Sequence, residues 1–121
     1  MTYEQVFDAS RSLVTVKASG PDDMKSSLEA LRMLRADPRF RDDYRILLDL
    51  RASKYVPVGT EFASMGIVIS SFFGRQLIAL VVDAPDVAKL QEFAAIITSG
   101  KADINVFNSA DAAERWLLRA A

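Results

Sequence analysis

The sequence contains neither histidine nor cysteine. Without histidine it lacks the side chain that enzymes use most often as a general base and that proteins use most often as a metal ligand. Without cysteine it has no disulfide bonds and no thiolate zinc site, which fits a reducing compartment. We therefore expect a cytoplasmic protein with no metal ion and no other cofactor.

Long apolar runs and an excess of positive charge are also missing. The strongly apolar run 77–82 has the length of a strand, so we expect no membrane span. The 15 basic and 16 acidic residues give a net charge of −1. No basic stripe is available to replace phosphate counterions, which argues against a nucleic-acid partner. The first five residues carry no basic leader and no apolar core, so we also expect no secretory signal.

What is present is a globular composition. Half of the 121 residues are hydrophobic and 26% are charged. A chain of this length buries about two thirds of its unfolded surface, which is enough for a core without covalent staples. We expect a single domain over residues 1–121.

Hydrophobic periodicity predicts an α/β fold with the order β-β-α-β-α-β-α-β-α. Two short runs with partial alternation predict a hairpin, and two later apolar runs predict central strands that are covered on both faces. Strands separated by helices predict parallel crossovers, so the expected sheet is mixed, mostly parallel and five-stranded, with helices on both sides. The expected strands are 3–7, 13–18, 46–50, 77–82 and 104–107. The charged stretch 35–45 is expected to be a solvated loop.

The predicted helix 60–73 is the most unusual element, because Glu61 is its only charged residue. A helix that is apolar nearly all round must be buried on more than one side. One interpretation is a surface that contacts a second copy of the chain, another protein or an apolar ligand. The alternative is a helix clamped between the sheet and a neighbouring helix, or β-structure over 66–70, where β-branched residues cluster. The candidate interface or ligand-binding residues are Thr60, Phe62, Met65, Ile69, Phe72 and Phe73.

Two carboxylates end predicted neighbouring strands, and we treat Asp49, Arg51 and Asp83 as a candidate loop site. Two carboxylates facing one edge would suit a hard cation such as Mg²⁺, although the sequence shows no third ligand. The alternative is that each carboxylate accepts backbone donors or pairs with an arginine such as Arg51 or Arg75. No nucleophile–base pair and no glycine-rich phosphate loop is visible, so we expect no catalytic residues and no enzymatic activity.

Four segments, in this order and spacing, resemble the STAS-like (SpoIIAA-like) family, whose small bacterial members also carry a STAS/SEC14 label. The segments are Gly20, 35–40 leading into 46–51, 73–81, and 106–117. The resemblance implies a compact α/β fold that serves as a regulatory or ligand-sensing module and is generally not an enzyme. In anti-sigma-factor antagonists of this kind, a Ser or Thr that opens the helix after the central strand is phosphorylated. The corresponding stretch here, 57–61, lacks the Asp-Ser-Ser/Thr-Gly order, and Thr60 is its only hydroxyl.

Three functional hypotheses follow. The first is a non-enzymatic STAS-like regulatory or interaction module, expected to be a homodimer or to bind a partner protein through the helix 60–73 and the loop 49–60. The second is a small carrier or sensor of an apolar ligand, which would bind beneath the same helix as the SEC14 side of the resemblance implies. The third and weaker hypothesis is a metal-assisted hydrolase at Asp49 and Asp83.

Overall fold

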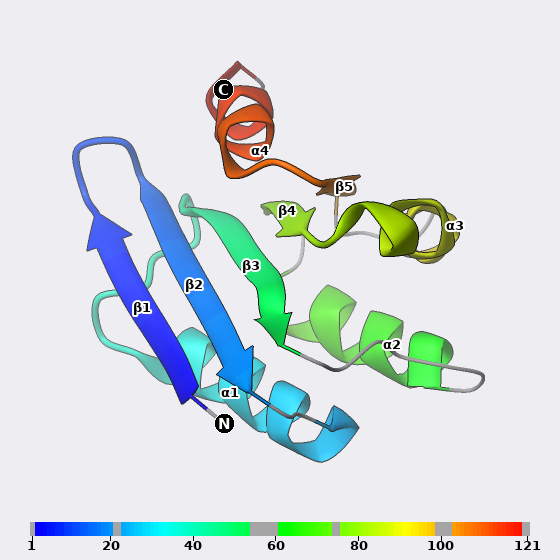
Figure 1. The fold of residues 1–121 in the computed structure, drawn as a ribbon. Coiled ribbons are helices and arrows are strands. Elements are labelled where there is room, and N and C mark those ends of the chain that lie inside the picture. Colours follow the sequence, from blue (N-terminus) through cyan, green and yellow to red (C-terminus); the bar gives the residue numbers. More distant parts are fainter. Residues whose placement is uncertain (1, 21–22, 54–60, 74–75, 99–102, 120–121) are drawn as a thin grey trace.

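The computed structural model describes residues 2–20, 23–53, 61–73, 76–98 and 103–119. Within these ranges it contains one five-stranded sheet with the strand order β1-β2-β3-β4-β5 (Figure 1). The order of elements is the predicted one, with a short 3₁₀ helix added before the third α-helix. The elements are β1 (Thr2–Asp8), β2 (Leu13–Gly20), α1 (Met24–Ala36), β3 (Arg45–Ser53), α2 (Glu61–Phe73), β4 (Leu77–Val81), η1 (Ala84–Asp86), α3 (Val87–Thr98), β5 (Asp103–Phe107) and α4 (Ala110–Arg119).

The predicted hairpin is confirmed, since β1 pairs antiparallel with β2 while β2 to β5 pair in parallel. Its turn is closed by Asp8, whose carboxylate accepts hydrogen bonds from the Ser10 hydroxyl (2.6 Å) and from Arg11 Nε (2.7 Å). Hydrogen bonds from Ser10 and Arg11 lower the pKa of Asp8 from its ordinary value of 3.8 to about 2. Arg11 also pairs with Glu114 of α4. The hairpin turn is therefore tied to the last helix.

The strand order explains why three helices lie on one face of the sheet. Each parallel crossover steps to the next strand in the same direction, and right-handed crossovers in one direction place their helices on one side. Helices α1, α2 and α3 accordingly share a face, while α4, which follows the last strand, covers the other (Figure 1). Helices on both sides of the sheet are thus confirmed, but in an uneven three-to-one arrangement.

The uneven cover divides the core into two parts. The larger part lies beneath α1–α3 and includes Val14, Ile46 and Ile78 from the sheet. The smaller part lies beneath α4 and contains Leu13, Leu47, Ala79, Val81, Ala113 and Leu117. Alternate residues of β3 and β4 enter the two parts, which accounts for their continuous apolar sequence.

Helix α1 has a capping residue at its start and a proline just after its end. Asp23 is its N-cap, and the side chain accepts a hydrogen bond from the backbone N–H of Ser26 at 2.8 Å. The helix ends at Asp37, which precedes Pro38 and has extended backbone angles. No described helix has both the length and the apolar character needed to cross a membrane.

The prediction that 35–45 is only a solvated loop is wrong. Phe40 and Tyr44 are buried in the larger core, where their rings meet edge to face. The buried side-chain amide of Gln76 donates to the backbone carbonyl of Tyr44 at 2.9 Å and so fastens the segment to the start of β4. Charge counting missed these anchors because two aromatic residues lie among many charged ones.

Candidate functional site

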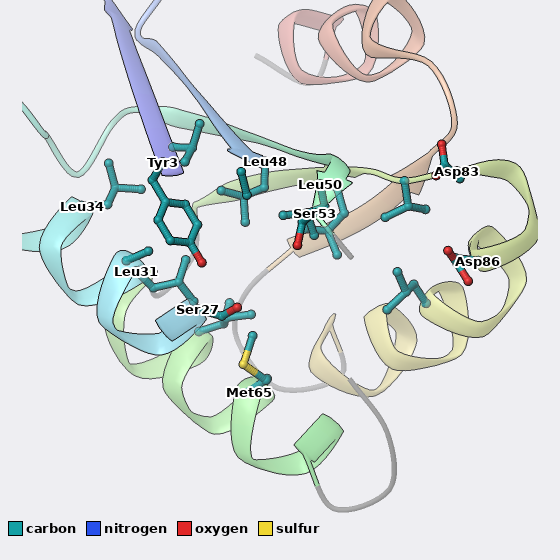
Figure 2. A pocket seen from close by; sticks show the side chains of 17 residues that line it. Tyr3, Ser27, Leu31, Leu34, Leu48, Leu50, Ser53, Met65, Asp83 and Asp86 are labelled. Carbon is teal, nitrogen blue, oxygen red and sulfur yellow. The ribbon is translucent and has the colours of Figure 1, made fainter. Parts of the chain in front are cut away.

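A largely apolar pocket lies between the sheet and helices α1–α3, at the carboxyl ends of the parallel strands (Figure 2). Its volume is about 90 Å³. Open α/β sheets characteristically bind ligands at this edge. We call it the carboxyl-edge pocket; it is lined by Tyr3, Val16, Ala18, Ser27, Ala30, Leu31, Leu34, Leu48, Leu50, Ser53, Met65, Ile69, Leu80, Val82, Asp83, Asp86 and Leu90.

The sheet supplies one wall of the pocket through the alternation of strand residues. Leu48 and Leu50 of β3 point to the α1–α3 side, whereas Leu47 and Asp49 point to the side of α4. The register between β2 and β3 then shifts, because Lys17 pairs with Asp49 while the next pairing joins Ser19 to Ala52. This bulge reverses the alternation, so Ser53 enters the pocket while Ala52 turns away from it.

Hydroxyl groups and carboxylates are the polar groups of the pocket. Figure 2 shows the Tyr3 ring along one wall with its hydroxyl directed toward Ser27 and Met65. Asp83 and Asp86 lie on the opposite side, where β4 runs into η1. The pocket is thus apolar in its interior and acidic along one side.

A second, more open hollow lies on the other face of the sheet, where α4 does not cover β1 and β2. We call it the polar hollow; its lining is Thr2, Glu4, Lys17, Ala18, Ser19, Asp49, Arg51 and Ala52. Arg51 donates to both carboxylate oxygens of Asp49, from Nε at 2.9 Å and from Nη2 at 2.7 Å. These hydrogen bonds hold the pKa of Asp49 below its ordinary value, against the opposing effect of burial. Asp49 is thus a structural partner of Arg51, which was one of the two alternatives considered for it.

The two carboxylates of the candidate loop site do not converge. Asp49 faces the polar hollow and Asp83 lines the carboxyl-edge pocket, so the expectation that both face one edge is wrong. Asp49 also does not end its strand, because β3 continues to Ser53. Among the described residues no group of three acidic, histidine or cysteine side chains is placed to hold a metal ion. The hydrolase hypothesis therefore has no third ligand in this part of the chain.

Helix α2 is clamped between α1 and α3 over the sheet, as the second interpretation of its sequence required. Met65, Ile69 and Phe73 are buried, and Phe72 is partly buried against the same core. Met65 and Ile69 also line the carboxyl-edge pocket. On the outer side of the helix, Ile67 is 69% exposed. Thr60 and the side chain of Phe62 lie outside the described residues.

The pocket contains residues that the sequence did not single out, namely Tyr3, Ser27, Ser53 and Asp86. For Tyr3 a signal existed, since it shares the inward face of its strand with Gln5 and Phe7. Ser27 directly precedes Leu28 in α1, and the position of Ser53 depends on the bulge in β3. No sequence rule predicted that these three elements would meet.

Comparison with solved structures identifies the fold. The chain is similar to the crystal structure of an anti-sigma factor antagonist from Mycobacterium paratuberculosis, with a TM-score of 0.59 and 13% sequence identity. The match covers 96% of this chain and 94% of that chain. No protein-family model and no curated protein matches the sequence. This protein therefore has the SpoIIAA/STAS fold, and the predicted resemblance is confirmed at the level of the fold.

Proposed function

We propose that this protein is a regulatory module that acts by binding, and that the carboxyl-edge pocket takes up a small, largely apolar ligand. The observation that carries the proposal is the pocket itself. It lies at the edge where α/β sheets place ligands, and apolar residues from the sheet and all three crossover helices form most of its lining. Of the two main sequence hypotheses, this favours the carrier or sensor of an apolar ligand.

The regulatory part of the proposal is supported by the fold. The similar structure is described as an anti-sigma factor antagonist, which is a regulatory protein that acts on another protein. In this proposal, occupancy of the pocket would be communicated to a partner through α2, because Met65 and Ile69 line the pocket from this helix. Activity as a binding module rather than an enzyme belongs to the same proposal.

The experiment that tests ligand uptake is a titration with toluene, a small apolar probe, in which binding is followed through the NMR signal of the Met65 methyl group. We expect saturable binding with a dissociation constant on the order of 1 mM or below. Ala30→Leu places extra carbon atoms in the pocket and should weaken binding by at least about tenfold. Ala88→Leu makes the same change at an exposed position of α3 and should leave the affinity unchanged. Equal affinities of the two variants for toluene would show that toluene does not bind in the carboxyl-edge pocket.

A second candidate function is a contact with a second copy of the chain or with another protein through the outer side of α2. The observation behind this candidate is Ile67, a large apolar side chain that is 69% exposed on this side of the helix. If a homodimer forms there, light scattering of the wild type at high concentration should give a dimer mass, and Ile67→Glu should give a monomer. A monomer in both samples would exclude the homodimer.

A further inference from the structure

The charged residues that line the carboxyl-edge pocket, among those the structure describes, are both acidic. They are Asp83 and Asp86, and no lysine or arginine is part of this lining. Both lie on the side of the pocket opposite Tyr3 and Ser27 (Figure 2). The pocket therefore combines an apolar interior with negative charge on one side.

The fold does not use these carboxylates in the usual ways. Asp83 is the N-cap of η1, yet its side chain makes no capping hydrogen bond; the contact there is from the backbone N–H of Asp86 to the Asp83 carbonyl at 2.9 Å. Neither carboxylate takes part in the ion pairs found among the described residues. The charge of Asp83 contributes to raising the pKa of Arg51. The guanidinium of Arg51, however, is hydrogen-bonded to Asp49 in the polar hollow. Within the described residues, the negative charge is available to a ligand.

The helix dipoles oppose this charge but do not cancel it. The amino-terminal ends of α1, α2 and α3 lie at the same edge of the sheet, and each corresponds to about half a positive charge. A carboxylate stands at each end: Asp23 caps α1, Glu61 opens α2, and Asp86 lies at the start of α3. Asp83 adds a further full charge next to α3. A cation is therefore favoured over an anion at the Asp83/Asp86 side of the pocket.

We infer that the carboxyl-edge pocket is selective for a small primary amine with an apolar body, bound with its ammonium group at Asp83 and Asp86. The volume of about 90 Å³ limits the ligand to a small apolar body that carries the amine. An ammonium group provides three hydrogen-bond donors for the two carboxylates. The apolar walls would hold the body, as in the proposed function on which this inference rests.

The test compares probes that share one aromatic body, namely toluene, benzyl alcohol, benzylamine and benzoate, titrated against the wild type at pH 7 and low salt. We expect benzylamine to bind about fivefold more tightly than benzyl alcohol, and benzoate to bind most weakly. In Asp86→Asn the amine preference should fall below about twofold, and in Asp83→Asn it should fall in the same direction. Circular dichroism confirms that each variant is folded.

Asp111→Asn is the matched control, because Asp111 lies in the first turn of α4 on the opposite face of the sheet. It removes the same charge from the same kind of helix position and should keep the full amine preference. Binding of toluene without an amine preference would overturn the selectivity and leave the proposed function standing. An amine preference that Asp111→Asn reduces as much as Asp86→Asn would also overturn it. If toluene does not bind, the selectivity and the ligand-binding function fail together.

Discussion

Leu117→Ala is expected to lower the free energy of unfolding by about 3–4 kcal/mol. Leu117 is a fully buried residue of α4, the only described helix on its face of the sheet, and it packs against the strands of the smaller core. The smaller core contains six buried residues, two of which are alanines, so few side chains can move into the space left by the leucine. The loss is a large part of the 5–15 kcal/mol that typically stabilises a domain. Unfolding in urea measures this loss of stability. The m value, which is the dependence of the free energy of unfolding on urea concentration, should be the same in the variant and the wild type.

The neighbouring residue provides the control. Leu118 follows directly on the same helix but is only partly buried, so Leu118→Ala makes an identical chemical change outside the smaller core. We expect this variant to lose less than about 1 kcal/mol. Equal losses in the two variants would contradict the packing of α4 on the sheet.

Arg51→Met has the second largest expected effect on stability, a loss of roughly 1–2 kcal/mol at neutral pH. Asp49 is only 7% exposed, and the variant leaves its carboxylate without the two hydrogen bonds from the guanidinium. An ion pair in which both side chains are buried contributes a larger loss of stability when one partner is removed. Here the Arg51 side chain is 42% exposed, so water screens part of the interaction. Replacing both residues, as Asp49→Leu with Arg51→Met, should recover part of the loss because no charge then remains buried.

The pH dependence of this loss follows from the pKa of Asp49. Arg51 holds the folded-state pKa below the ordinary value of 3.8, so the stabilisation is complete above that value and disappears as the pH falls through the folded pKa. The difference in stability between the wild type and Arg51→Met should therefore be largest above about pH 4 and should shrink at pH 3 and below. Arg32→Met is the control, because it breaks an exposed pair with Glu29 and should cause no resolvable loss. A difference that grows on acidification would contradict the assigned role of Asp49.

The order of the helices and strands could be predicted from the sequence, because apolar periodicity and turn residues mark most of these elements locally. The alternation of residues 13–18 predicted β2, and the structure buries Val14, Val16 and Ala18 on the inward face of this strand. The observed strand order, combined with right-handed crossovers, explains why α1, α2 and α3 share one face. Local rules and topology therefore agree over most of the sheet.

The pocket could not be predicted from the sequence, because it depends on how elements that are distant in sequence meet. Tyr3 comes from the first strand and Asp86 from the segment after β4, and nothing local links them. Ser53 faces the pocket only because the bulge in β3 reverses the alternation. The apolar character of α2 was recognised, but its sequence could not say how much of the helix α1 and α3 would cover.

The most direct test of the central claim is to locate bound toluene by NMR, through magnetisation transfer from its ring protons to protein methyl groups. Ligand uptake in the carboxyl-edge pocket predicts transfer to Met65 and Leu31, which line the pocket from α2 and α1. Met33 and Ile67 serve as references, because they lie on the same two helices but are 58% and 69% exposed. Transfer to Met65 and Leu31 that is lost in Ala30→Leu is the expected result. Transfer confined to Met33 and Ile67 would place the probe on the surface and contradict the account.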